Sequence, residues 1–373
     1  MKLFASSLIC LSLFSLFPMT ARAADGKGPE KSGIVPIPAL YYTPETALAA
    51  GGLLIYYFRN DDDPEGAKPS QIKPLVITTQ KKQLITSLLL SRRWNGGKDH
   101  LSVFSRYRRY PDKIWGTGPD TTSSMEEDYS ANLASVEVSW ERALDIDAAS
   151  WLTGWIDGWS AGPVAVYGGY KITKKEAGGL VADGDLTGAE GSRTGGFGIL
   201  MSRDTRDNLF AAAAGVFDSL RIVHVAHLDG DHRPYDEVQF EARRYFSVAD
   251  SSVLVARLFA QGQDGDVPFR DLSSLGGPDR MRGYYEGRYR DKFALIGEGE
   301  YRFPVWWRLR GAVFASAGNV AGKMNDITST PARYSVGGGV RAVVDERERI
   351  AIRVDYGKTP ESEGLYVQLN EAF

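Results

Sequence analysis

The sequence of 373 residues is poor in the side chains that most metal and thiol sites require. It contains 1 Cys and 4 His, which leaves little for a zinc or thiol site. It also lacks a surplus of positive charge, because 44 Lys and Arg stand against 47 Asp and Glu, a formal net charge of −3. A chain so nearly balanced has no basic surface for a phosphate backbone, so we expect no nucleic acid partner and no metal or other cofactor.

Long apolar runs are missing everywhere except at the N-terminus. Residues 3–17 are largely apolar, follow Lys2 and precede an Ala-x-Ala cleavage motif at residues 21–23. They predict a signal peptide over residues 1–23, which would remove the one cysteine, Cys10. The run falls short of the ~20 residues of a membrane helix, which disfavours an uncleaved anchor. Since no later run is long enough either, a membrane-spanning form of this chain must be a β-barrel.

In place of helical patterns, the chain shows strict alternation of apolar and polar residues. In residues 350–356, for example, Ile352 and Val354 share one face, while Arg353 and Asp355 share the other. Such a period of two is typical of β-strands. It predicts sixteen strands, near residues 36–43, 47–58, 71–80, 83–94, 99–110, 128–142, 163–174, 193–202, 215–228, 235–247, 252–263, 293–303, 308–319, 333–344, 349–357 and 364–373. An even number of strands is what a single-chain outer-membrane barrel needs.

The connections between these strands fall into two kinds. Long polar segments alternate along the chain with tight turns; the long ones are 111–127, 175–192 and 264–292, and the tight ones 95–98, 304–307 and 345–348. Bacterial barrels have long extracellular loops and short periplasmic turns. The fold predicted is therefore all-β, a transmembrane antiparallel β-barrel of about 16 strands in the bacterial outer membrane, with outer-membrane lipid around it. The barrel would span residues 36–373, after a short periplasmic segment over residues 24–35.

One tryptophan-rich segment fits two interpretations. Trp151, Trp155 and Trp159 recur at four-residue spacing, which places them on one face of a helix. This spacing favours a short periplasmic helix against the membrane, and a strand explains the same residues nearly as well.

A family resemblance is carried by residues 193–373. The run Gly276-Gly277-Pro278-Asp279-Arg280-Met281-Arg282-Gly283-Tyr284 resembles the sixth-loop motif of the bacterial surface antigen superfamily, the BamA/TamA-type barrels. Four further segments resemble family strands and turns in the expected order: Asp204 to Asn208 with Arg206, Glu298 to Pro304, Gly311 to Asn319 with Gly318, and Tyr366 to Phe373.

The resemblance implies that the sixth extracellular loop folds into the lumen and is fixed there. We call Arg282, Gly283, Tyr284 and Glu300 the loop lock. Alternation places Glu298, Glu300 and Arg302 on the polar face of their strand, so Glu300 is the expected partner of Arg282. The family's second carboxylate would lie on the next strand, where Ser316 stands. The lock is therefore expected to contain one carboxylate. The alternative is that Arg282 is a solvated loop arginine.

The resemblance also suggests a function. Family members assemble outer-membrane proteins or translocate polypeptides, and carry periplasmic repeat domains that collect clients. This sequence resembles a barrel-only member, so a periplasmic partner protein is expected to supply that role. Unfolded outer-membrane or secreted polypeptides would be its clients. The alternative is a passive pore or structural barrel.

Motifs that resemble catalytic or metal sites lack the required context. Gly158 to Gly162 matches the Gly-x-Ser-x-Gly pattern, which needs a strand–turn–helix in an α/β sheet. His224 and His227 are three residues apart on a strand, hence on opposite faces. The loop that begins at Asp183 resembles a calcium loop but has Thr194 at position twelve, where Glu is required. We therefore expect no enzyme and no catalytic residues.

Overall fold

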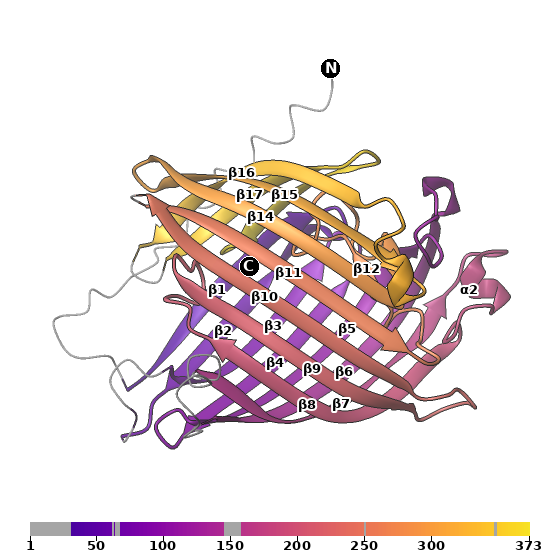
Figure 1. Cartoon of the computed structure of the whole chain (residues 1–373), viewed down its shortest axis with the longest axis horizontal. Coiled ribbons are helices and arrows are strands. Elements are labelled where there is room, and N and C mark those ends of the chain that lie inside the picture. The colour runs from indigo at the N-terminus through magenta and orange to yellow at the C-terminus, as the bar shows by residue number, and fades with distance from the viewer. Residues whose placement is uncertain (1–30, 62, 64–67, 145–157, 250, 347–348) are drawn as a thin grey trace.

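The predicted antiparallel barrel is confirmed. The computed structural model describes residues 31–61, 63, 68–144, 158–249, 251–346 and 349–373. In this part of the chain sixteen strands close into one barrel, in which chain neighbours pair and β11 pairs with β14 (Figure 1). The strands are β1 (Ser32–Thr43), β2 (Ala47–Phe58), β3 (Ser70–Thr79), β4 (Leu84–Trp94), β5 (Asp99–Ile114), β6 (Glu127–Ala143), β7 (Trp159–Lys174), β8 (Gly191–Asp204), β9 (Gly215–His227), β10 (Tyr235–Ala249), β11 (Ser252–Asp264), β14 (Phe293–Trp306), β15 (Leu309–Ala321), β16 (Arg333–Asp345), β17 (Ile350–Lys358) and β18 (Glu363–Leu369).

Two strand ends differ from the predicted ones in a way that matters. β1 begins at Ser32, inside the segment expected to precede the barrel. β18 ends at Leu369, whereas a strand to residue 373 was predicted. The cause lies at Asn370, whose φ of 64° belongs to the left-handed region and breaks the extended backbone. Asparagine tolerates that region better than most residues. The last residues therefore leave the barrel wall.

The two faces of the wall differ in burial. Along β14 the even-numbered residues from Ala294 to Arg302, among them Glu298 and Glu300, are buried, and Tyr301 is exposed. In a closed barrel the buried set is the one that faces inward. The outward face exposes large apolar side chains, up to Trp306 at 75% and Trp307 at 80%. An outward apolar surface with aromatic residues at its edge is what a lipid environment requires.

The connections sort to two ends of the barrel, as predicted. The loop end carries residues 115–126, 175–190 and 265–292; the turn end carries 95–98, 307–308 and 346–349. The segment 175–190 contains the short helix α2 (Leu180–Asp183), and 265–292 contains the two-stranded sheet of β12 (Ser273–Leu275) and β13 (Tyr289–Asp291). No helix in the described ranges is long and apolar enough to cross a membrane.

The closure of the barrel between β1 and β18 is much the shortest strand pairing. There the register pairs only Tyr42 with Val367, whereas β17 pairs with β18 from Ile352↔Leu369 to Lys358↔Glu363. β1 also contains Pro36 and Pro38, which cannot donate a ladder hydrogen bond. We call this junction the seam. It is the weakest point of an otherwise continuous hydrogen-bonded wall.

Candidate functional site

The candidate site begins in the loop 265–292, where backbone conformation is set by glycine. Gly276, Gly277 and Gly283 have φ values of 102°, 97° and 116°, which side chains rarely adopt. A Cβ on Gly276 would lie 1.9 Å from the carbonyl oxygen of Tyr285, and one on Gly283 would lie 2.8 Å from Cγ2 of Thr359. These positions hold residues 276–284 as a tight turn pressed against β17 and its connection to β18.

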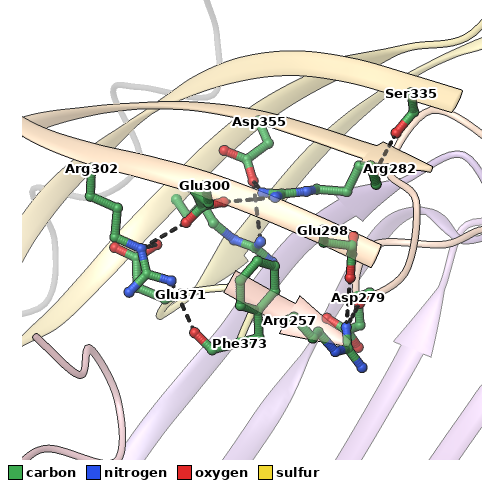
Figure 2. A network of polar contacts seen from close by, with 12 residues as sticks. Arg257, Asp279, Arg282, Glu298, Glu300, Arg302, Ser335, Asp355, Glu371 and Phe373 are labelled. Carbon is green, nitrogen blue, oxygen red and sulfur yellow. Dashed lines mark hydrogen bonds and ion pairs between the residues drawn. The ribbon is translucent and has the colours of Figure 1, made fainter. Parts of the chain in front are cut away.

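Arg282 extends from this turn between two carboxylates (Figure 2). Its Nη2 donates to Oε2 of Glu300 on β14 at 2.7 Å, and its Nη1 donates to Oδ2 of Asp355 on β17. The guanidinium lies 3.4 Å from the ring centroid of Phe314 on β15, and the residue is 2% exposed. Burial opposes the charge of Arg282, but Glu300 and Asp355 outweigh burial and raise its pKa above the ordinary value.

The same carboxylates hold further arginines of the inner wall. Glu300 accepts from Nε of Arg302 at 2.7 Å, and Asp355 accepts from Nη1 of Arg341 at 2.6 Å. Together with Arg353 and Glu371 these residues form what we call the arginine–carboxylate network: Arg282, Arg302, Arg341, Arg353, Glu300, Asp355 and Glu371. Buried charges persist only when they are paired. The network meets that condition and joins the loop to β14, β16 and β17.

The expectation of a lock with one carboxylate is wrong. The second carboxylate exists, but it is Asp355 on β17, three strands along the wall from β14. Ser316, in the position where an acid was expected, donates or accepts a hydrogen bond with Ser335 at 2.7 Å. The reason is geometric, because Arg282 lies on a loop and contacts inward-facing side chains of two strands that are not neighbours. Strand adjacency does not limit its partners.

The rest of the loop lock is fixed by main-chain contacts. The N–H of Gly283 donates to the hydroxyl of Tyr366 on β18 at 2.9 Å, and its carbonyl accepts from Ser362 at 2.8 Å. Tyr284 is buried in an apolar cluster with Phe259, Leu275, Met281, Tyr289, Ala294, Ile296 and Val320. Burial raises the pKa of Tyr284 to about 12, so its ring stays neutral. The described contacts of residues 281–284 thus run to inward-facing side chains.

Of the other motif residues, Gly318 and Gly277 support this turn, whereas Pro304 does not contact it. A Cβ on Gly318 of β15 would lie 2.9 Å from the sulfur of Met281, so glycine makes room for the residue next to Arg282. Gly277 brings the chain within van der Waals distance of Glu286. Pro304, at the far end of β14, pairs with Arg310 near the turn end.

Asp204 and Arg206 lie at the turn end, away from the loop lock. Arg206 binds Asp204 through Nε at 2.9 Å and Nη2 at 3.1 Å, and Lys68 reaches the same carboxylate at 3.1 Å. This bidentate pair begins the connection 205–214, in which Asp207 accepts from the N–H groups of Ala213 and Ala214. The sequence motif therefore marks a rigid turn-end connection.

Phe373 connects the arginine side chains near the loop lock with the turn-end connection 205–214. Its ring centroid lies 5.6 Å from the guanidinium of Arg257, and its main-chain oxygen accepts from Nη2 of Arg302 at 2.9 Å (Figure 2). The same residue packs against Ala212 of the connection 205–214. The aromatic end of the chain was expected to complete the last strand. It lies instead inside the barrel, because the backbone turns at Asn370.

The remaining sequence motifs do not assemble into sites. Ser160 lies in β7 and pairs with Ser202 of β8, so the strand–turn–helix of a nucleophile elbow is absent there. His224 binds Asp236 at 2.8 Å, while His227 binds the carbonyl oxygen of Asp266 at 2.7 Å. Trp151 and Trp155 lie outside the described residues. Trp159 is the first residue of β7, so the helical interpretation is wrong at that position.

Asp355, Arg341 and Glu371 also belong to the site, and the sequence alone did not identify them as members. Alternation does place Asp355 on the polar face of its strand, and that was the available signal. Alternation cannot predict the path of the loop, and that path determines which inward-facing acid Arg282 contacts. The assembled residues are paired ions and buried aromatics without an activated nucleophile. Such an arrangement fixes a loop in place.

These observations define a class of protein: a closed sixteen-stranded β-barrel with an apolar outer surface, whose long loop is tied to inward-facing charges. A family model for the Omp85 superfamily domain matches residues 148–358, which is more than half of the sequence. The chain belongs to the Omp85 superfamily. This confirms the predicted resemblance to BamA-type barrels.

Comparison with solved structures supports the same fold. The barrel is similar to BamA from Haemophilus ducreyi lacking POTRA domains 1-3, with 13% identity over 92% of this chain and 71% of that chain, at a TM-score of 0.60. It is also similar to CdiB from Acinetobacter baumannii (12% identity, 92% and 60% covered, TM-score 0.55) and to CdiB from Escherichia coli (12%, 92% and 63%, TM-score 0.57). The chain thus spans about three fifths of the CdiB chains. The search of curated proteins gave no match.

Proposed function

We propose that this protein lies in the bacterial outer membrane and takes part in the assembly of outer-membrane proteins or the translocation of polypeptides. The observation that carries the proposal is the seam, where β1 and β18 share the single register pair Tyr42↔Val367. A barrel closed by so little hydrogen bonding opens there at lower cost than at any other strand pair. An opened seam presents strand edges to which an incoming strand can pair.

The loop 265–292 contacts both sides of the seam. Gly283 binds Tyr366 on β18, and the N–H of Glu286 donates to Oε1 of Glu45, in the turn between β1 and β2, at 2.9 Å. The arginine–carboxylate network anchors this loop and also holds Glu371, just beyond β18. In the proposed mechanism the β18 side stays fixed, and β1 moves when the contact at Glu45 is lost. The loop lock then sets how readily the seam opens.

The alternative is a passive pore or structural barrel. One of its two grounds, the expected one-carboxylate lock, does not apply, because Arg282 contacts two carboxylates. Periplasmic partners and polypeptide clients belong to the proposed role.

Depletion of the protein in its native bacterium, followed by quantitative proteomics of the outer membrane and the medium, tests the proposal. We expect a defined set of outer-membrane or secreted proteins to fall, and to recover with the wild-type gene. Arg280→Gln is the matched control for an Arg282→Gln gene, because Arg280 carries the same charge but forms no ion pair among the described residues. Unchanged protein content together with altered permeability to small solutes would favour the passive barrel.

A further inference from the structure

The inner face of the barrel is apolar next to the seam, unlike the charged inner face of β10 to β17. Residues that pair directly across two antiparallel strands lie on the same face of the sheet. The inward face can therefore be followed from β1 to β4 through the pairs Val35↔Ile55, Ile37↔Leu53, Leu53↔Leu75 and Ile77↔Ile85. Ile55 and Ile77 are 8% and 6% exposed, which identifies this side as the inward one. The inner apolar wall consists of Val35, Ile37, Leu53, Ile55, Leu75, Ile77, Ile85 and Leu89.

This wall is unusual because the outward residues of the same strands are apolar too. Leu54 and Val76, for example, face outward and are exposed. A barrel lumen filled with water needs polar side chains on its inner face. The inner apolar wall therefore carries a hydration cost that an apolar occupant would remove.

Two cations border the inner apolar wall on β5. Arg106 pairs in register with Ser87, and Arg108 with Ile85, so both guanidinium groups lie on the inward side beside the wall. Within the described ranges neither forms an ion pair, and Nε of Arg108 is buried without a hydrogen-bond partner. The field of Glu286 reaches Arg106, but no ion pair joins them. Lys73, within the wall itself, likewise shows no carboxylate partner in the described part of the chain.

These cations contrast with Arg282, Arg302, Arg341 and Arg353 of the arginine–carboxylate network, each of which is matched by a carboxylate. The two guanidinium groups lie 5.9 Å and 5.5 Å from the ring centroids of Phe104 and Tyr110, contacts that leave their charge without a carboxylate. A guanidinium in that position is stabilised by an anion. The geometry thus presents an apolar surface with a positive edge, which is the complement of an anionic amphiphile.

We propose that the inner apolar wall and Arg106 and Arg108 form a binding site for one anionic phospholipid. The phosphate-containing headgroup binds the two guanidinium groups, and the acyl chains lie across β4 to β1. The three strand spacings of about 4.8 Å between β1 and β4 give the wall a width of about 14 Å for those chains. The lipid enters through the seam, which borders the wall at β1. The loop end is closed to it, because Tyr285 and Glu286 contact Asp112 and Glu45 there.

A lipid fits this surface better than a polypeptide strand does. Sheet ladders use the backbone groups between neighbouring strands from β1 to β4, and the free backbone edge of β1 lies at the seam, outside the face of the inner wall. The inner wall itself offers mainly apolar side chains, with the guanidinium groups of β5 at its border and Lys73 and Ser87 among its members. The site is independent of the proposed role in assembly or translocation, since it concerns what the lumen binds.

Lipid retention by the purified, full-length protein tests the site. The protein is extracted in detergent, washed, exposed to phosphatidylglycerol or phosphatidylcholine, and the lipid retained per barrel is measured by mass spectrometry. We expect retention of phosphatidylglycerol over phosphatidylcholine, and a loss of about tenfold in affinity for phosphatidylglycerol in Arg106→Gln/Arg108→Gln, equivalent to about 1.4 kcal/mol. The matched control is Arg109→Gln, which removes a charge from the outward side of the same strand. Equal affinity in the double variant and the control would overturn the site.

A second measurement locates the lipid and tolerates changes in yield. A bimane label at Leu75→Cys reports from the inner wall, and folded barrels are selected by their gel mobility without boiling. Brominated phosphatidylglycerol should quench this label, and Arg106→Gln/Arg108→Gln should reduce the quenching. The same label at Val76→Cys, on the outward side, should be quenched equally in both backgrounds. Absence of quenching at position 75, or quenching that ignores the two arginines, would contradict the proposal.

Discussion

Neutralising Arg282 tests the loop lock most sharply. Arg282→Gln keeps much of the side-chain volume but leaves Glu300 and Asp355, both fully buried, short of a cation. Removing one partner of a buried ion pair costs about 3–5 kcal/mol. If that energy holds the loop 265–292 in place, the equilibrium for loop release rises by about a hundredfold to about four-thousandfold. The loop-release equilibrium of Arg282→Lys should lie between those of the wild type and Arg282→Gln, because an ammonium cannot present a planar fork to both carboxylates.

The assay is limited trypsin digestion of the folded protein in detergent, since cleavage of a transiently released segment follows its opening equilibrium. We expect fast cleavage within residues 276–292 of Arg282→Gln while the barrel keeps its unboiled gel mobility. Arg280→Gln controls for both the lost charge and the lost trypsin cleavage position. The guanidinium of Arg280 contacts the ring of Phe259 and forms no ion pair among the described residues. If Arg282→Gln resists trypsin as well as Arg280→Gln does, the network does not hold the loop.

Three further predictions concern the same loop and its neighbours. Gly283→Ala should release the loop as Arg282→Gln does, because its Cβ would meet Thr359 at 2.8 Å, whereas Gly299→Ala has open space and should behave as wild type in the same digestion. Burial, reinforced by the charge of Glu286, raises the pKa of Glu45 from 4.5 to about 7. The stabilisation that protonated Glu45 gives to the fold is therefore complete below about pH 4.5 and is lost as pH rises through 7. Trypsin resistance of the loop, compared at pH 6 and pH 8, should therefore fall with pH in wild type and stay flat in Glu45→Gln. Deletion of Phe373 should lower the yield of folded barrel in the outer membrane, and an unchanged yield would show that its buried contacts are dispensable.

Alternation was sufficient to find the barrel wall, because the two faces of each strand meet different surroundings. The stretch predicted over residues 47–58 is β2, and the one over 83–94 is β4 to within a residue. The same logic placed Glu300 and Asp355 on inward faces. It failed at Phe373, where the path of the chain depends on the left-handed backbone of Asn370 and on packing with Ala212.

The partners of Arg282 could be predicted only in part. Glu300 follows from strand register, since it lies on the strand directly after the loop. Asp355 does not, because its contact with Arg282 joins residues 73 positions apart across the lumen. Only the closed barrel and the turn at Gly283 bring those two side chains together. Arg106 and Arg108, which form no ion pair among the described residues, show the same limit. A sequence predicts the side of a strand on which a residue lies but not the residue that it meets across the barrel.

The central claim is that the barrel works by opening at the seam. Tyr42→Cys/Val367→Cys places two thiols across it, in a protein whose one native cysteine is Cys10. Val354→Cys/Val367→Cys is the matched control, because it links the same residue of β18 to β17 instead. Growth and outer-membrane protein content should fall when oxidation joins Tyr42→Cys to Val367→Cys and recover with reductant, while the control pair has no effect. Full function with the seam covalently closed would contradict the account.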